Sequence, residues 1–259
     1  MMPAERREKI VSLLTEKKYI SLNEIVNKTN IPKSTLRRDI FELEQEGLLV
    51  RMRGGVSLNG DMEPFNVSSE SSVHVRKSEN RDEKIRIAKA AMQFIHPNDT
   101  LFLDSGTTTY ELAVLLKEYN HNLMIACNDL SSSLELSNNE LLEVIVVGGK
   151  LRKRNYSMIG YFSENIISQM HADTSFISTD AVDPERGLMA FSLDEVTGKK
   201  AMIKGAREVI LLCDHTKFSR IAFVTISGFE EIDRIITGKE ISENVRLYLT
   251  EMGIDVILA

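Results

Sequence analysis

The sequence predicts an α/β protein of two parts, a small N-terminal helical domain and a larger α/β domain with a mostly parallel sheet. In the first 58 residues, three short helical patterns are followed by a hairpin pattern. Further along the chain, apolar strand-like runs alternate with helical segments, and strands are predicted at 100–103, 123–127, 143–147, 174–178, 208–213, 223–226, 234–237 and 254–258. Alternation of this kind is typical of parallel sheets that carry helices on their faces.

The three N-terminal helices are predicted from apolar spacing and from end signals. Ile10, Leu13 and Leu14 form one apolar stripe, as in a helix that packs one face on a core. Ser21 begins "SLNE", a capping box that opens the second helix. In "KSTLRRDIFELEQEG" apolar residues recur at i, i+4 and i+7 before Gly47, a typical helix stop.

Three short helices with tight connections predict a helix-turn-helix. In the "LLVRMRGGVSL" that follows, arginines alternate with apolar residues before a Gly-Gly pair, which predicts a β-hairpin. We therefore expect a winged helix-turn-helix domain over residues 1–56.

This domain is expected to bind double-stranded DNA. When the third helix of such a domain enters the major groove, its N-terminal residues face the base edges, and the wing reaches phosphates or the minor groove. Residues 1–58 hold 11 Lys and Arg against 8 Asp and Glu, although the whole chain has a net charge of −6. A basic head on an acidic body attracts the phosphate backbone through the head alone. The candidate DNA contacts are Lys33, Ser34, Thr35, Arg37, Arg38, Arg51 and Arg53.

Two other interpretations of the basic helix stay open at this point. "RRD" is also the pattern of an ordinary solvated face with local ion pairs, and a winged helix can bind protein instead of DNA. Salt dependence separates these alternatives, because binding to phosphates weakens steeply as salt rises.

The body of the chain is expected at residues 73–259, after a polar, Ser-rich linker at 57–72. Ligands of parallel sheets collect at the carboxyl ends of the strands. Polar or small residues follow several predicted strands there: Asp104 to Thr109, Cys127 to Asp129, Gly148 with Gly149, Asp180, and Asp214 to Lys217. "LFLDSGTTTYEL" carries a strand into a helix through small and hydroxyl residues, a typical seat for a phosphate. A shared polar pocket is therefore predicted.

The N-terminal segment resembles the DeoR-type family of bacterial transcription regulators. Thr35 to Ile40, Leu43, Gly47, Arg51, Gly54 and Gly55 match its recognition-helix and wing signature. Pro32 stands where the family usually has a capping Ser, so the cap is expected to be lost or shifted to Ser34.

The resemblance extends through the body and so covers essentially the whole chain. It rests on six motifs: Lys84 with Ile87 and Ala88, "DSGTT" from Asp104, Cys127 with Asn128, Gly148 with Gly149, Glu195 with Lys199, and Asp214 with Thr216 and Lys217. The resemblance implies a fold similar to ribose-5-phosphate isomerase and the CoA-transferases, and a domain that senses a phosphorylated sugar.

The resemblance also implies roles for the matched residues. Ser105, Gly106, Thr107 and Thr108 would hold the phosphate, and Lys84 and Lys217 would neutralise it. Asp214, Asn128 and Asp180 would take sugar hydroxyls or the lysines. The sequence departs from the family at Cys127, which replaces Thr, at Ser178 and Ala181, which replace glycines, and at Gly238, which replaces Asp.

The function expected is that of a repressor released from its operator when a phosphorylated sugar binds the body. A sugar-phosphate isomerase is the alternative, since Asp180, Asp183, Glu195 and Lys199 are chemically capable of proton transfer. The Gly-rich stretch with Lys found in the similar isomerase is absent, because "PERGLMAFS" stands in its place. An enzyme is therefore not expected.

Composition and residue spacing predict the state of the cysteines, the absence of metal sites, the location and the assembly of the protein. Two cysteines, Cys127 and Cys213, each end an apolar run and are expected as buried free thiols, and the five histidines lack metal-ligand spacing. We expect no metal or cofactor, no membrane span and a cytoplasmic location. A homo-oligomer, dimer or tetramer, is expected because half-sites on DNA are read by symmetric assemblies.

Overall fold

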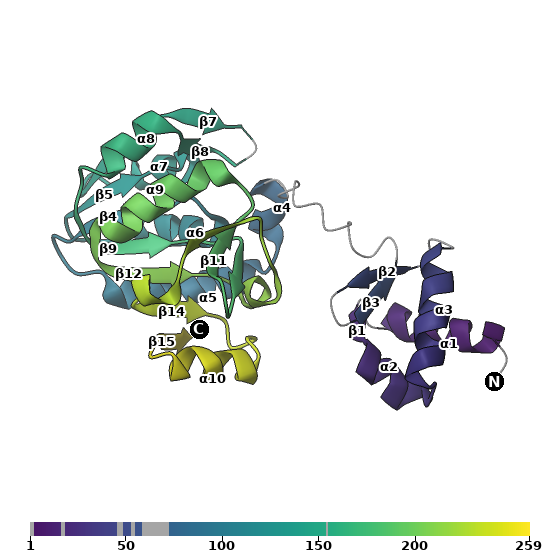
Figure 1. Cartoon of the computed structure of the whole chain (residues 1–259). Coiled ribbons are helices and arrows are strands. Elements are labelled where there is room, and N and C mark those ends of the chain that lie inside the picture. The colour runs from purple at the N-terminus through teal and green to yellow at the C-terminus, as the bar shows by residue number, and fades with distance from the viewer. Residues whose placement is uncertain (1–2, 17–18, 46–48, 53–54, 59–72, 154) are drawn as a thin grey trace. The chain divides into compact units, whose positions relative to one another are not determined.

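The computed structural model divides into two compact units, Met1–Asn66 and Val67–Ala259 (Figure 1). It describes residues 3–16, 19–45, 49–52, 55–58, 73–153 and 155–259. Most of the predicted linker at 57–72 lies outside the described residues, and its first two residues belong to a strand that ends at Leu58.

The N-terminal unit contains the three predicted helices, α1 (Pro3–Glu16), α2 (Leu22–Thr29) and α3 (Lys33–Gln45). The side chain of Ser21 caps α2 by accepting a hydrogen bond from the N–H of Glu24, as the capping box predicts. The apolar stripes of the helices meet in one core that includes Ile10, Leu14 and Leu36. Gly47, the predicted stop of α3, lies outside the described residues.

The wing is a three-stranded sheet in the order β1-β3-β2, formed by β1 (Tyr19–Ser21), β2 (Leu49–Met52) and β3 (Gly55–Leu58). The sequence predicts the β2–β3 hairpin but not β1, a strand of three residues between two helices. Residues 53 and 54, in the predicted turn, lie outside the described residues.

The C-terminal unit is built on a parallel sheet of seven strands in the order β15-β14-β12-β9-β4-β5-β6. Its strands are β4 (Thr100–Leu103), β5 (Leu123–Cys127), β6 (Leu142–Val146), β9 (Ala172–Ile177), β12 (Ala206–Leu212), β14 (Arg234–Thr237) and β15 (Asp255–Leu258). Each of these strands coincides within a few residues with one that the sequence predicts.

Helices cover both faces of this sheet, so the unit has three layers (Figure 1). One core contains Ile87 and Leu112, from the helices of one layer, and the other contains Ile167 and Met202, from the helices of the opposite layer. The helices are α4 (Val73–Ser78), α5 (Arg81–Ala91), α6 (Thr107–Leu116), α7 (Leu130–Leu136), α8 (Tyr161–Ile167), α9 (Leu193–Lys204) and α10 (Glu243–Glu251), with short 3-10 helices η1 (Met92–Phe94), η2 (His215–Ser219) and η3 (Phe229–Glu231).

Two small antiparallel elements accompany the large sheet. The hairpin of β7 (Lys150–Arg152) and β8 (Ser157–Ile159) follows β6, and a three-stranded sheet contains β10 (Ala181–Asp183), β11 (Gly187–Ala190) and β13 (Val224–Ser227). The apolar run predicted as a strand at 223–226 is therefore β13, which pairs with β11 outside the parallel sheet. An apolar run reveals a buried strand but does not reveal its partner.

Cys127 and Cys213 lie at the ends of β5 and β12, and both are buried free thiols. Burial raises the pKa of Cys127 to about 12 and raises the pKa of Cys213 well above its ordinary value. Among the residues that the structure describes, no helix is long and apolar enough to cross a membrane.

Candidate functional site

The first turns of α3 present the residues that the sequence assigns to DNA contact. Lys33, Ser34, Arg37 and Arg38 are exposed and Thr35 is half-buried. Leu36, Ile40 and Leu43 of the same helix are buried in the core of the unit, whereas Phe41 is exposed. One face of α3 is thus fixed by packing, and the opposite face carries mostly basic and hydroxyl side chains.

The acidic residues of α3 are held by arginines of α1. Asp39 is buried and accepts two hydrogen bonds from Arg6, at 2.7 and 2.9 Å. Glu42 pairs with Arg7 and, more weakly, with the exposed Arg38 at 3.4 Å. Asp39 therefore joins α1 to α3 and does not belong to the outward face.

The start of α3 and the wing arginines complete the predicted DNA-binding surface. The carbonyl of Pro32 accepts the hydrogen bond of the Leu36 N–H, so Pro32 itself occupies the N-cap position. Ser34 lies inside the first turn, so the expectation of a cap shifted to Ser34 is wrong. Arg51 lies on β2, and Arg53 lies outside the described residues.

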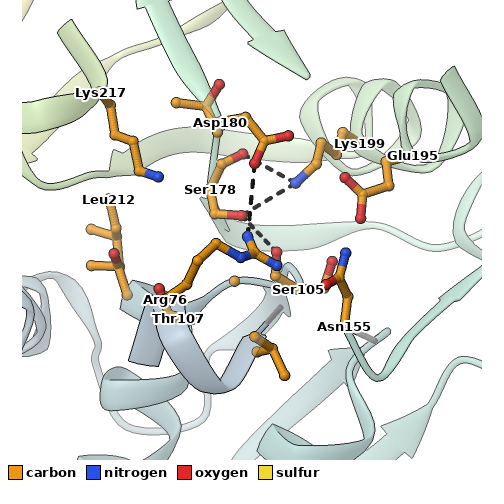
Figure 2. Close-up of a pocket in the computed structure, with 14 residues that line it drawn as sticks. Arg76, Ser105, Thr107, Asn155, Ser178, Asp180, Glu195, Lys199, Leu212 and Lys217 are labelled. Carbon is orange, nitrogen blue, oxygen red and sulfur yellow. Dashed lines mark hydrogen bonds and ion pairs between the residues drawn. The ribbon is translucent and has the colours of Figure 1, made fainter. Parts of the chain in front are cut away.

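The C-terminal unit has a pocket of about 510 Å³, open solvent at its mouth included, at the carboxyl ends of β4, β9 and β12 (Figure 2). Among the residues predicted as ligand-binding, residues 105–108, Asp180, Glu195, Lys199 and Lys217 line it. The pocket is also lined by residues outside the predicted ligand-binding set: Val73, Arg76, Asn155, Ser178, Thr179 and Leu212.

The N-terminus of α6 forms one wall of the pocket. The chain enters the helix through Gly106, and the side chain of Thr109 bonds back to the carbonyls of Asp104 and Gly106. The first N–H groups of a helix have no partner inside the helix, so this end can donate hydrogen bonds to an anion. A Cβ on Gly106 would lie 2.5 Å from the Oγ of Ser178, so this close approach requires glycine.

A buried ion pair lies next to the pocket, and one of its two residues, Lys199, lines the pocket. The ammonium of Lys199 contacts the carboxylate of Asp104, and it also donates to the carbonyl of Ser178 at 3.1 Å. The same carboxylate accepts from the N–H of Ser178 at 2.9 Å and from its hydroxyl at 2.8 Å. Burial alone lowers the pKa of Lys199, but Asp104, with Glu195 and Asp180 nearby, outweighs burial and raises the pKa above its ordinary value. Lys199 is thus charged and already neutralised by Asp104.

Two further cations extend into the pocket from different elements (Figure 2). Arg76, on α4, lies 3.7 Å from Asp180, whose carboxylate also accepts from the N–H of Phe191 at 2.9 Å. Lys217, on η2, is half-buried and, within the described part of the chain, makes no ion pair shorter than 4 Å. Arg76 could not be predicted as a pocket residue, because in the sequence it is only an arginine in a short polar segment.

Glu195 is also occupied by a partner. Arg152, on β7, forms an ion pair with Glu195, and the hydroxyl of Ser157 on β8 lies 3.5 Å from the same carboxylate. The β7–β8 hairpin that carries Arg152 also brings Asn155 to the pocket. The pocket therefore contains two carboxylates, Asp180 and Glu195, each beside an arginine.

Lys84 does not line the pocket, in contrast to the role implied for it. Its buried ammonium donates to the backbone carbonyls of Arg76 at 2.5 Å and Glu79 at 2.7 Å. Burial lowers its pKa to about 8, although Asp214 partly offsets this effect. Lys84 therefore holds the end of α4 and is not placed to neutralise a ligand.

The remaining predicted residues also lie outside the pocket. Asp214 caps η2 by accepting from the N–H of Thr216, and its pKa is lowered because Lys217, Thr216 and Lys84 together outweigh the effect of burial. Asp104 and Asn128 line a smaller adjoining recess of about 220 Å³.

Gly148 and Gly149, also predicted as ligand-binding, directly precede β7 and do not line the pocket. A Cβ at Gly149 would lie 2.7 Å from the carbonyl of Ile159, so glycine is required for the approach of two chain segments. Gly148 has open space around its Cα.

Glu83, Asp214 and His215 form one group in which potential metal ligands lie within 4.8 Å of one another. The ring Nδ1 and the backbone N–H of His215 already bond to the carboxylate of Glu83, at 2.8 and 2.7 Å. These contacts account for the arrangement without an ion.

A chain that contains a winged helix-turn-helix unit and an α/β unit with a polar pocket has the architecture of transcriptional regulators that carry a separate sensor domain. The chain belongs to the DeoR family. The family model described as the DeoR C terminal sensor domain matches residues 79–239, and that of the DeoR-like helix-turn-helix domain matches residues 6–61.

The curated relatives match along their full length. The glycerol-3-phosphate regulon repressor of Escherichia coli K12 is 32% identical over 258 residues, 100% of each chain. A putative aga operon transcriptional repressor of Escherichia coli O157:H7 is 31% identical over 255 residues, 98% of this chain and 93% of the relative. Because its relatives are transcriptional regulators, the chain is a regulator and not an isomerase.

Solved structures with a similar fold include enzymes. Ribose-5-phosphate isomerase A of Methanocaldococcus jannaschii is 16% identical with a TM-score of 0.41, over 54% of this chain and 55% of the isomerase. eIF2B delta of Chaetomium thermophilum is 14% identical with a TM-score of 0.43, over 90% of this chain and 70% of that protein. The chain thus spans about half the length of the isomerase, and these similarities concern the fold alone.

Proposed function

We propose that this regulator represses a carbohydrate-metabolism operon and that a phosphorylated sugar, bound in the pocket of the C-terminal unit, releases it from its operator. The observation that carries the proposal is the meeting of three features in one pocket: the N-terminus of α6, Arg76 and Lys217. A phosphate group carries between one and two negative charges at neutral pH and accepts several hydrogen bonds. Helix N–H groups and flanking cations match both needs.

The hydroxyl groups of a sugar also have partners in this pocket. Asp180 and Glu195 line it, and each lies beside an arginine, so their charges do not repel an anion as free carboxylates would. Carboxylate oxygens accept hydrogen bonds from hydroxyl groups. The name of one relative, a glycerol-3-phosphate regulon repressor, agrees with a phosphorylated effector.

DNA contact is assigned to the outward face of α3, with Lys33, Ser34, Thr35, Arg37 and Arg38, and to the wing arginines Arg51 and Arg53. Arginine can bind guanine with two hydrogen bonds, and hydroxyl side chains can bind bases or phosphates. We expect a homo-oligomer, a dimer or a tetramer, because each chain carries one winged helix and paired half-sites need two.

The test starts with selection of duplexes from a random pool by the full chain, which supplies an operator. Polarisation titrations with that operator are then repeated at several salt concentrations and with a panel of phosphorylated sugars and polyols. The proposal requires a logarithmic salt slope of several units and release by at least one phosphorylated ligand. No enrichment of any duplex, or a flat salt response, would refute DNA binding. Enrichment without release by any ligand of the panel would refute the proposed effector class.

A further inference from the structure

Helix α4 is the first described helix after residues 59–72, and it carries two residues that line the pocket, Val73 and Arg76. It is thus the element of the C-terminal unit that is nearest in sequence to the DNA-binding unit and also touches the proposed effector site. A short helix of six residues has little stability of its own, so its position depends on its contacts.

Three contacts hold the sides of α4. The ring of His74 lies 3.2 Å from the hydroxyl of Tyr156, in the β7–β8 hairpin. The ammonium of Lys77 lies over the ring of Tyr110 on α6, 3.3 Å from its centroid. Arg76 faces Asp180 across the pocket (Figure 2). The helix therefore spans the pocket between α6, the hairpin and the loop that carries Asp180.

A fourth contact, from Lys84 on α5, fixes the C-terminal end of α4. Lys84, on α5, donates to the carbonyls of Arg76 and Glu79, and its side chain is buried. Burial of an ammonium group is unfavourable unless its hydrogen bonds are made, so these two carbonyls have a fixed position relative to α5. The backbone of Arg76 itself is one of the two anchor points.

The Arg76–Asp180 contact is the longest of these contacts. Its 3.7 Å separation exceeds the 2.7–2.9 Å that is usual for a charge-assisted hydrogen bond. A phosphate at the N-terminus of α6 would offer Arg76 more charge and more acceptor oxygens than Asp180 does. The anion would then become a further partner of Arg76, in addition to Asp180, and would draw α4 towards α6.

We propose that α4 transmits effector binding to the DNA-binding unit, and this inference rests on the proposed function. Arg76 is the anion ligand, and Lys84 is the positioning residue that couples Arg76 to the helix backbone. A ligand shifts an equilibrium only through different contacts in the two states, and the added contact between Arg76 and the anion supplies such a difference.

The coupling is tested with Lys84→Met and the matched control Lys89→Met, an exposed lysine on the same helix. Operator affinity without effector should be unchanged in both variants. With saturating effector, the operator dissociation constant should rise about tenfold or more in wild type and in Lys89→Met, but less than about threefold in Lys84→Met. Lys84→Arg, which keeps the charge and donors, should restore part of the response. Full release in a folded Lys84→Met protein would overturn the proposal.

The movement of α4 can be tested independently by fluorescence. The chain contains no tryptophan, so a single introduced tryptophan reports on its own site. Val75→Trp on α4 and the control Leu134→Trp on α7 each introduce one fluorophore at an exposed site. Inorganic phosphate and the effector should change the emission of the Val75→Trp protein and leave that of Leu134→Trp unchanged. Ligand binding by thermal shift without any change in Val75→Trp emission would overturn the α4 proposal and leave the proposed function intact. Absence of any thermal shift in wild type would overturn both.

Discussion

The ammonium of Lys199 contacts the carboxylate of Asp104, and both side chains are buried where the pocket meets its adjoining recess. The pair links α9 to the end of β4, and through Ser178 it also links both to the end of β9. Its charges compensate one another, so the pair organises the site and leaves the charge of a ligand to Arg76 and Lys217.

Lys199→Met should lower the free energy of unfolding by about 3–5 kcal/mol, because the variant leaves the Asp104 carboxylate buried without its cation. Urea unfolding monitored by circular dichroism measures this loss, and Lys200→Met, at the exposed neighbouring lysine, is the control. The double variant Lys199→Met with Asp104→Asn should regain part of the stability. A loss below about 1 kcal/mol in the single variant would contradict a compensating role for the pair.

Arg37→Ala should weaken operator binding and reduce the logarithmic salt slope by about one unit if the guanidinium contacts a phosphate. Stabilisation of the protein by effector should not change, because Arg37 lies on α3 and the pocket lies in the other unit. Arg207→Ala removes the same charge from a highly exposed position in the C-terminal unit and serves as the control. Equal affinities for wild type and Arg37→Ala would remove Arg37 from the DNA interface.

Lys217→Ala should leave operator binding intact and weaken release by effector, because the pocket loses a cation that has no ion-pair partner among the described residues. Polarisation titrations with increasing effector should show a right shift of about tenfold or more, in keeping with the 1.5–3 kcal/mol of a hydrogen bond to a charged group. Lys200→Ala is the matched control. If Lys217→Ala abolished DNA binding while the protein stayed folded, the assignment of the pocket would be wrong.

The buried Lys84 gives stability a specific pH dependence. Its pKa is about 8 in the folded chain against an ordinary value of 10.5, so the unfolded chain binds more protons between these values. The free energy of unfolding should therefore rise with pH across this window, by up to about 1.4 kcal/mol per pH unit. Below pH 8 the contribution of Lys84 to the free energy of unfolding should not change with pH. Asp214, Lys217, Glu79 and Arg76 are the charged groups that act on Lys84.

Urea unfolding of wild type and Lys84→Met at a series of pH values isolates this contribution, since other titrating groups cancel in the difference. Wild type should gain relative to the variant as pH rises from 8 to 10.5. A difference that does not change with pH would show that the ammonium is not held in the buried position described.

Much of the fold could be predicted because its signals are local. The capping box at Ser21 and the apolar stripe of α3 fixed the helices of the first unit, and alternation of apolar runs with helices predicted the parallel sheet. Small antiparallel elements such as β1, β7 and β8 were missed, because strands of three residues carry too little periodicity.

Residues that are neighbours in sequence could be placed in the pocket from local order alone, whereas Asp180, Glu195, Lys199 and Lys217 could be proposed only from their place after strands or from the family resemblance. Residues 105–108 follow a strand and begin a helix, so their place in the pocket follows from local order. Gly148 and Gly149 also follow a strand, but the chain turns there into a hairpin. The resemblance implied that Lys84 neutralises the ligand, but Arg76 lines the pocket and Lys84 does not. The sequence does not tell which lysine or arginine faces the pocket.

The two native thiols have a practical consequence for work on this chain. Cys127 and Cys213 are enclosed at strand ends and stay protonated at neutral pH, and reaction with maleimides requires an accessible thiolate. A cysteine introduced at an exposed position can therefore carry a dye or a spin label while both natural sulfur atoms remain unmodified. Distance measurements between labelled copies can begin from the natural sequence, without first constructing a cysteine-free background.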